Sequence, residues 1–430
     1  MPSRLTYIYI VVFLLVLTLI TFAHQSTATE FTLPLLPSSY SYNSPNVQTN
    51  FTDAENRHLS QHECLVRYPE LYVEADRANA YYAKRGGIKQ SDVDEAEADG
   101  ASARLVILDN KLFVKAFYGG INTRTQAAIA AVYGTLMTSP EPMPDVDFVI
   151  QTSDGGGGVH PHFVLCRKAS QPELWLMPDF GFFAWPEPGV GSYSQVRAES
   201  LLFEETKLDL QLSSSDPSTI RHDSWEKKIK KLMWRGSPMV EVRQDLLRAS
   251  KDQSWSDVQE LNWGAVNQDQ EGREKNNGDI KTPAEHCQWG FLAHVEGWAY
   301  SGRLKYLQQC RSVIVTHPLE YIQHYHHLLI SSEKDPKQNI VEVPLPLEEH
   351  LPAAMEALLD PTNQERRERI VENSWRDMRE GYISPAANEC YYRYALRAYA
   401  EVQAFKPELG EGVPYESFLL MGTTKWDPHR

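Results

Sequence analysis

The sequence has few cysteines and lacks the short motifs that mark several common enzyme classes. No two cysteines stand at the Cys-x-x-Cys spacing, so a structural zinc site is disfavoured. One or two disulfides with a spare thiol fit a lumenal chain, and the sequence leaves their pairing open. A P-loop, a Gly-x-Ser-x-Gly motif and a His-Glu-x-x-His motif are absent too. The five cysteines are Cys64, Cys166, Cys287, Cys310 and Cys390.

Positive charge is scarce relative to negative charge. The chain has 42 Lys and Arg residues against 57 Asp and Glu residues, which gives a net charge of −15. This balance argues against nucleic acid or an anionic membrane surface as the main partner. The length of 430 residues predicts two domains, or at most three, with enough chain for sizeable hydrophobic cores.

The N-terminus carries a long apolar run at residues 5–23, directly after Arg4. At about 1.5 Å per residue, this run just crosses a thin bilayer such as that of the early secretory pathway. A cleaved signal peptide usually has a shorter apolar stretch, of about 7–15 residues. We therefore favour an uncleaved single-pass signal anchor over a cleaved signal peptide. Arg4 would be cytoplasmic, and the rest would be lumenal in the endoplasmic reticulum or Golgi.

The residues after the apolar run predict a stem and two folded domains. Asn50 begins a glycosylation sequon, which agrees with lumenal exposure. It lies in residues 24–60, whose Ser, Thr, Pro and Asn content is typical of a flexible stem. We then expect α/β domains at residues 61–215 and 216–405, the second including C-terminal helices, and a tail at residues 406–430.

A strand, a glycine-bearing turn and a helix follow one another at residues 289–309, and residues 312–316 form the next expected strand. This order is typical of half a nucleotide-binding α/β domain. Gly297 and Gly302 allow close backbone approach, and a helix start near Ser301, the expected N-cap, offers free N–H groups to an anion. With Arg303 and Lys305 beside them, these features favour a phosphate-bearing ligand. On spacing alone, the alternative interpretation is an ordinary strand-to-helix turn whose basic residues are solvated.

A second unit of this kind begins at Lys231. We expect a basic helix at residues 225–231, a strand at 231–234, a turn at 235–238 and a helix at 240–250 that carries Arg243. Because this unit again places an arginine and a glycine after a strand, the two units together favour phosphate binding more strongly than one. Further helices are expected at residues 65–85, 124–137, 347–359, 362–380 and 386–405.

In the first domain, the pattern predicts a hairpin at residues 104–115 and a strand at 147–151. That strand delivers Asp154 to its carboxyl end, where ligands of α/β sheets bind, so Asp154 is well placed for chemistry. The alternative is an aspartate that caps the glycine turn at residues 155–158. The acidic residues after 87 are expected to form a solvated surface segment.

Other clusters predict no metal site. Asp145 and Asp147 have the Asp-x-Asp form but precede their strand, so we interpret them as surface acids. The histidines at 160–162 and 324–327 lack an acidic or cysteine partner at a recognisable spacing, which favours solvated or packed side chains. The aromatic residues at 174–186 could form a sugar platform, although core packing suits most of these rings.

Four segments, in this order and spacing, resemble the capsule-associated-protein glycosyltransferases: residues 148–154, 177–187, 234–243 and 296–305. That family includes fungal capsule xylosyltransferases and animal protein O-glucosyltransferases, and the resemblance covers residues 61–405. It implies two facing Rossmann-like domains, the B-type glycosyltransferase architecture, behind the membrane anchor. It also implies a UDP-sugar donor, inversion at the anomeric carbon, and no metal or other cofactor.

The resemblance also implies roles for individual residues. Asp154 matches the catalytic base, and Arg235 matches the arginine that holds the donor diphosphate. The implied acceptor residues are Asp179, Phe180, Phe182, Phe183 and Trp185. The implied donor-binding residues are Arg235, Gly236, Ser237, Arg243, Glu296, Gly297, Trp298, Ala299, Tyr300, Ser301, Gly302, Arg303 and Lys305.

We therefore expect an anchored lumenal glycosyltransferase that moves glucose or xylose from a UDP-sugar to a hydroxyl of a protein or glycan. Inverting transfer needs one carboxylate base and cationic groups for the departing diphosphate, which Asp154 and the arginines would supply. Two alternatives stay open: a catalytically silent module that binds nucleotide sugar or glycan, and a metal-dependent hydrolase that uses the histidine clusters.

Overall fold

The computed structural model describes residues 54–119, 122–155, 158–185, 190–208, 225–261, 280–422 and 424. The chain divides into the units Met1–Gln48 and Thr49–Arg430, and all described residues belong to the second unit. The predicted anchor, most of the predicted stem and Asn50 lie outside the described residues. Within the described ranges, we find no helix that is both long and apolar enough to span a bilayer.

The first half of the fold is built on a six-stranded mixed sheet, in the order β13-β2-β1-β3-β4-β5. Strands β1 and β2 form the predicted hairpin, and its turn residues Asp109 and Asn110 have φ values of 48° and 60°. Short polar side chains tolerate this left-handed conformation, which suits a tight hairpin turn. The strands are β1 (Ala103–Leu108), β2 (Lys111–Phe117), β3 (Val146–Gln151), β4 (His162–Val164), β5 (Trp175–Leu176) and β13 (Val413–Pro414).

Only part of this sheet follows the Rossmann-like pattern that we expected. Strands β3, β4 and β5 are parallel, whereas β1 pairs antiparallel with both β2 and β3. The hairpin explains the antiparallel pairing of β1 with β2, because a short turn can join only antiparallel strands. The structure therefore shows a mixed α/β sheet whose parallel part carries β3, the strand before Asp154.

Helices surround the first sheet, and some of them differ from the sequence prediction. The single helix expected at residues 65–85 is two helices, because Pro69 disfavours helical backbone at Tyr68. The acidic segment expected to be solvated is helix α4, which buries Val93 and Ala96. The helices are α2 (Gln61–Arg67), α3 (Val73–Ala83), α4 (Gln90–Ala98), α5 (Thr123–Thr138), α6 (Tyr193–Thr206), α13 (Pro385–Val402) and α14 (Tyr415–Met421).

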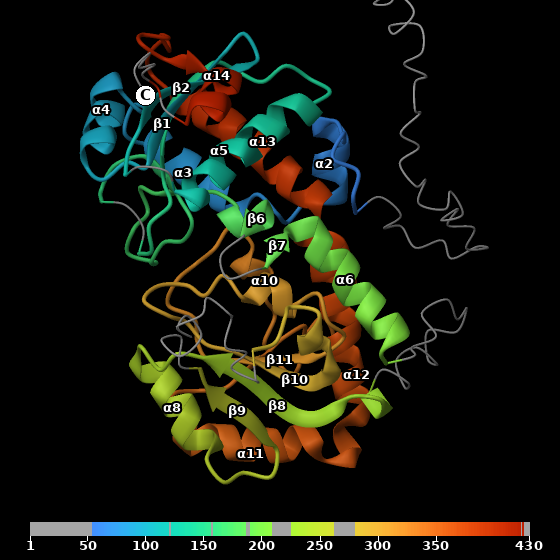
Figure 1. Cartoon of the computed structure of the whole chain (residues 1–430). Coiled ribbons are helices and arrows are strands. Elements are labelled where there is room, and N and C mark those ends of the chain that lie inside the picture. The colour runs from blue at the N-terminus through green and yellow to red at the C-terminus, as the bar shows by residue number, and fades with distance from the viewer. Residues whose placement is uncertain are drawn as a thin grey trace, which may run out of the picture. The chain divides into compact units, whose positions relative to one another are not determined.

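The C-terminal helix α13 packs on the first half, although we assigned its residues to the second domain. It contacts α3 and α5, and Figure 1 shows it beside α5. A disulfide between Cys64 and Cys390 ties it to α2. The predicted tail also contributes, since β13 pairs with β2.

The second half is built on a five-stranded sheet in the order β12-β11-β10-β8-β9, and all of its strands are parallel. This is the nucleotide-binding pattern that the sequence predicts for this region, and Figure 1 shows β8 to β11 side by side near α8 and α11. Its elements are β8 (Ile229–Gly236), α8 (Glu241–Ser250), β9 (Ser256–Glu260), β10 (Trp289–His294), α10 (Leu304–Leu307), β11 (Val313–Thr316), β12 (Val341–Glu342), α11 (Leu347–Leu359) and α12 (Gln364–Asn373).

Two predicted helices of this half are wrong in extent. Of the basic helix predicted at residues 225–231, only residues 225–226 are helical, because β8 already begins at Ile229. The helix after Arg303 has only four residues. The helix predicted at residues 362–380 is confirmed, as α12 and the π-helical stretch Ser374–Tyr382 that continues it. The remaining short elements are η1 (Phe180–Phe182), β6 (Ala184–Trp185), β7 (Gly191–Ser192), η2 (Glu285–Gln288), η3 (His326–Leu328) and η4 (Pro361–Asn363).

The two halves share one apolar core. The largest buried cluster combines Phe148 and Trp175 of the first half with Leu292, Leu304 and Tyr306 of the second. A second disulfide, between Cys287 and Cys310, joins the two ends of the segment that contains β10, the following loop and α10. Cys166 is the buried free thiol, so the expectation of up to two disulfides with a spare thiol is confirmed.

Candidate active site

Asp154 lies three residues beyond the end of β3, at the carboxyl end of the parallel strands, as predicted. Its side chain is 49% exposed, and its Oδ1 atom is 3.2 Å from Nη1 of Arg124. Within the described ranges, Oδ2 accepts no hydrogen bond. One carboxylate oxygen of Asp154 therefore has no partner among the described residues and can accept a hydrogen bond from a ligand.

Arg243 connects helix α8 to the loop after β10. Its Nε donates to the carbonyl oxygen of Glu296 at 2.8 Å, and its Nη1 donates to that of Ser237 at 3.2 Å. A Cβ atom at Gly297 would lie 3.1 Å from Nη2 of Arg243, so a larger residue would press on the guanidinium. The structure thus brings together four residues that we predicted for donor binding.

Arg243 and Arg303 lie on the same aromatic ring. The Cζ atom of each is 5.9 Å from the ring centroid of Trp234, which is fully buried. Burial lowers the pKa of both guanidinium groups, to about 10 for Arg303, where the charge of Arg243 contributes. Neither forms an ion pair with any residue that the structure describes. Two cations, one buried and one half-buried, that pair with no carboxylate of the described residues favour the binding of an anion.

Arg235 already has a carboxylate partner. The resemblance implies that this residue binds the donor diphosphate. Its Nη2 atom is 2.7 Å from Oδ1 of Asp257, and the residue is 4% exposed. Asp257 also accepts a hydrogen bond from Nε1 of Trp289, at 2.8 Å. Gly236 beside it has a packing role, since a Cβ atom there would lie 2.5 Å from the ring of Trp234.

The loop at residues 296–303 differs from the predicted helix start. Helix α10 is a single turn and its N-cap is Arg303, so Ser301 caps nothing and the helix start adds little to anion binding. Gly297 N–H donates to the carbonyl of Ala299 at 2.9 Å, which presents Trp298 at the tip with 69% exposure.

Tyr300 places this loop close to Asp154. Burial raises the pKa of Tyr300 well above its ordinary value, and the negative charges of Asp179 and Asp154 act in the same direction. Because such charge effects require short separations, Asp154 lies near Tyr300 of this loop.

Lys305 and Asp179 bind each other, which is a correction to both of their predicted roles. The Nζ atom of Lys305 lies 2.8 and 2.9 Å from the two carboxylate oxygens of Asp179, and both side chains are buried. Gln323 donates a further hydrogen bond to Asp179, at 2.9 Å. This network links the two halves and leaves neither charge free for a substrate.

We expect Lys305→Met to destabilise the fold by about 3–5 kcal/mol, because it leaves Asp179 buried without its counter-ion. Urea unfolding would measure this loss. The double variant Lys305→Met/Asp179→Leu should recover much of it, since no unpaired charge remains. The predicted role of Lys305 in donor binding would stand if Lys305→Met kept parental stability and lost affinity for UDP.

Two of the predicted acceptor aromatics belong to the core. Phe180 and Phe182 are 4% and 7% exposed, whereas Phe183 is 42% exposed. Trp185 lies edge-on to Phe180, and one of its ring carbons is 3.9 Å from the position of a Cβ atom at Gly302. Of the predicted aromatics, Phe183 and Trp185 are therefore the ones that a ligand can reach.

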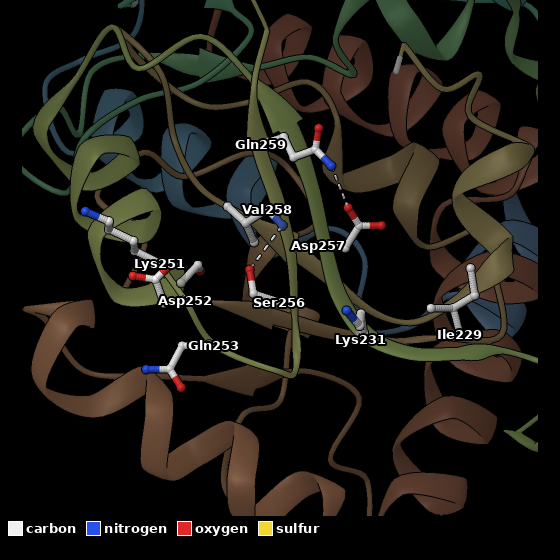
Figure 2. A pocket seen from close by; sticks show the side chains of 10 residues that line it. Ile229, Lys231, Lys251, Asp252, Gln253, Ser256, Asp257, Val258 and Gln259 are labelled. Carbon is white, nitrogen blue, oxygen red and sulfur yellow. Dashed lines mark hydrogen bonds between the residues drawn. The ribbon is translucent and has the colours of Figure 1, made fainter. Parts of the chain in front are cut away.

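Neither of two hollows in the described part of the chain fits a sugar ring beside Asp154. Asp179, Phe182 and Phe183 line a cavity of about 30 Å³, which holds about one water molecule. An open hollow of about 620 Å³ lies along the β9 edge and is shown in Figure 2. No predicted site residue lines this larger hollow.

Only some members of the acidic and histidine clusters are packed inside the fold, and Asp145 is exposed, as predicted. Asp147, which we expected at the surface, is fully buried and pairs with Arg104 and Lys115, each at 2.8 Å. His162 is also fully buried, and its Nε2 is 2.7 Å from the carbonyl oxygen of Ala96. Among the described residues, no group of three or more His, Cys, Asp or Glu side chains could hold a metal ion.

Buried histidines predict a loss of stability in mild acid. Burial lowers the pKa of His286 to about 4, and it lowers the pKa values of His294 and His324 well below 6.5. The unfolded chain therefore binds these protons below pH 6.5 while the folded chain does not, so stability falls from pH 6.5 towards pH 4. The slope is about 1.4 kcal/mol per pH unit for each histidine.

Denaturant unfolding at pH 7 and pH 4.5 measures this effect. His324→Leu removes one titrating group from among the rings of Phe182 and Tyr391, so its stability should depend less on pH than that of the parent. Equal pH dependence in the two proteins would contradict the assignment.

Sequence reasoning missed Arg124 and Asp257. Arg124 stands in the first turn of α5, where the helix dipole disfavours a cation, and that mismatch is a signal that the sequence contains. The sequence contains no such signal for Asp257, because only the pairing of β8 with β9 brings it next to Arg235.

Comparisons with known proteins confirm the resemblance. The family model described as glycosyl transferase family 90 matches residues 67–415. A protein named O-glucosyltransferase rumi homolog, from Anopheles gambiae, is 28% identical over 191 residues, which are 43% of this chain and 45% of that protein. The match thus spans less than half of the mosquito protein. The chain belongs to glycosyl transferase family 90.

Proposed function

We propose that this glycosyltransferase moves a sugar from a UDP-sugar to an acceptor hydroxyl, with inversion at the anomeric carbon. One observation carries the proposal. Two guanidinium groups without carboxylate partners among the described residues, those of Arg243 and Arg303, lie 5.9 Å from the ring centroid of Trp234, and the half-exposed carboxylate of Asp154 is close enough for its charge to act on Tyr300 of the loop at residues 296–303. An anionic leaving group and a base are what a displacement at a sugar carbon needs.

The arginines would act on the departing diphosphate. Its negative charge grows as the bond to the sugar breaks, and positioned guanidinium groups stabilise that charge. Gly297 lets the backbone come close to the diphosphate, while Arg243 holds the loop through the Glu296 carbonyl. Because the two guanidiniums supply positive charge themselves, we propose that transfer needs no metal ion.

Asp154 would act on the acceptor. Its Oδ2 atom takes the hydroxyl proton while the acceptor oxygen attacks the anomeric carbon from the side opposite the diphosphate. One displacement of this kind inverts the configuration. Phe183 and Trp185 would contact the acceptor, which we propose to be a protein or glycan.

The donor sugar is proposed to be glucose or xylose. The name of the mosquito relative, an O-glucosyltransferase, favours testing glucose first. Purified protein should release UDP from UDP-glucose or UDP-xylose in the presence of acceptor peptides or oligosaccharides, and EDTA should not stop the reaction. Tight UDP binding without release from any donor and acceptor would favour a silent binding module instead.

We also propose a lumenal location behind an N-terminal anchor, in the endoplasmic reticulum or Golgi. The disulfides Cys64–Cys390 and Cys287–Cys310 support an oxidising compartment. A C-terminal tag should be protected from protease in sealed microsomes, and the protein should stay with the membrane after a carbonate wash. A soluble secreted product that begins near residues 24–29 would contradict the anchor.

A further inference from the structure

Arg124 contacts two residues of the candidate active site and has no role in the function proposed above. Its Nη1 atom is 3.2 Å from Oδ1 of Asp154, and its Cζ atom is 5.0 Å from the ring centroid of Phe180. A cation in the first turn of a helix opposes the helix dipole, so stability of α5 does not explain the residue.

The backbone on both sides of this ion pair is fixed. Thr125, the next residue of α5, shares a hydrogen bond of 2.7 Å with Thr152, two residues before Asp154. A second hydrogen bond also holds Thr152, because its backbone N–H donates to Oγ of Ser102 at 2.9 Å. The Arg124–Asp154 pair therefore joins two anchored segments, unlike an ordinary surface pair between two mobile side chains.

We propose that Arg124 is a positioning residue for sugar transfer, which holds Oδ1 of Asp154 and thereby directs Oδ2 toward the acceptor hydroxyl. The proposal rests on the proposed function, in which Asp154 is the base. In that step the acceptor oxygen bonds to the anomeric carbon, the bond from this carbon to UDP breaks, and the hydroxyl proton passes to Oδ2. Arg124 exchanges no proton. It limits the directions in which the carboxylate can point, and stacking on Phe180 limits its own movement.

Arg124→Ala should lower kcat by at least about tenfold and leave the Kd for UDP within about threefold of the parent. Arg124→Lys should recover part of kcat, because an ammonium group can hold one oxygen but lacks the planar face that stacks on Phe180. Arg85→Ala is the matched control, since Arg85 stacks on Tyr81 at 3.5 Å, and it should keep the parental kcat. Thermal melting of each variant shows that it is folded.

A double-mutant cycle tests whether Arg124 acts through Asp154. If it does, adding Arg124→Ala to Asp154→Asn should lower the residual rate by less than about twofold. The proposal is overturned by a parental kcat in Arg124→Ala, by a tenfold loss of UDP affinity, or by the full loss of rate on the Asp154→Asn background. Parental transfer by Asp154→Asn itself would contradict the proposed function. A slow Asp154→Asn beside a fully active Arg124→Ala would contradict only the positioning role.

Discussion

Asp154→Asn is expected to lower the rate of sugar transfer by about 10² or more, the usual scale for losing a positioned base. The substitution keeps the size of the side chain and one acceptor oxygen, so Arg124 retains a hydrogen-bond partner. The base contacts the acceptor and not the nucleotide. The Kd for UDP should therefore stay within about threefold of the parental value, a change in binding free energy of about 0.7 kcal/mol or less. Calorimetry with UDP and a UDP-release assay measure the two effects separately.

Asp145→Asn is the matched control for this prediction. Asp145 is exposed and stands just before β3, the strand that Asp154 follows, and it accepts a hydrogen bond from Asp109 N–H. This variant should transfer sugar at the parental rate. Parental transfer by Asp154→Asn would instead mean that Asp154 only caps the glycine turn and that the base lies elsewhere.

Arg303→Ala is expected to weaken UDP binding by about tenfold or more. A charge-assisted hydrogen bond contributes about 1.5–3 kcal/mol, and each 1.4 kcal/mol is about a factor of ten in Kd. Arg243→Ala should have at least this effect, because it removes one guanidinium and also releases the Glu296 carbonyl. Arg303→Lys should restore only part of the affinity, since an ammonium group cannot reproduce the planar fork of the guanidinium.

Arg248→Ala is the control for the arginine pair. Arg248 lies on the same helix as Arg243, but it is exposed and paired with Glu241 at 2.8 Å, so UDP affinity should not change.

Arg235→Ala tests whether Arg235 binds the donor diphosphate, as the resemblance implies, or only pairs with Asp257. Because Arg235 is paired with Asp257, its loss should cost stability more than UDP affinity. If folded Arg235→Ala bound UDP about tenfold more weakly while Arg303→Ala bound it with the parental Kd, Arg235 and not Arg303 would be the residue that binds the diphosphate.

Much of the fold could be predicted because its signals are local. The turn at Asp109 and Asn110, the apolar residues of β1 and β2, and the buried run of β10 each depend on a few neighbouring residues. The position of Asp154 followed from the same logic, since a strand end fixes where the next residues lie. The antiparallel pairing of β1 with β3 could not be predicted, because nothing local specifies which strand a hairpin joins.

The candidate site was predicted less well, because motifs give residue types without their partners. Lys305 and Asp179 are 126 positions apart, and only the folded chain shows that each neutralises the other. In the same way, Arg235 has the residue type that a diphosphate needs, but the register of β8 against β9 places Asp257 beside it. The arginines that remain without a carboxylate among the described residues, Arg243 and Arg303, were in the predicted set, and their shared contact with Trp234 distinguishes them.

The configuration of the product tests the central claim most directly. In the proposed site, one carboxylate and one pair of arginines perform a single displacement on the sugar of a UDP-sugar. Proton NMR of the product formed from UDP-α-D-glucose or UDP-α-D-xylose should therefore show a β-linked sugar, and Asp154→Asn should form about 10² times less of it. An α-linked product, or undiminished β-linked product from Asp154→Asn, would contradict the account.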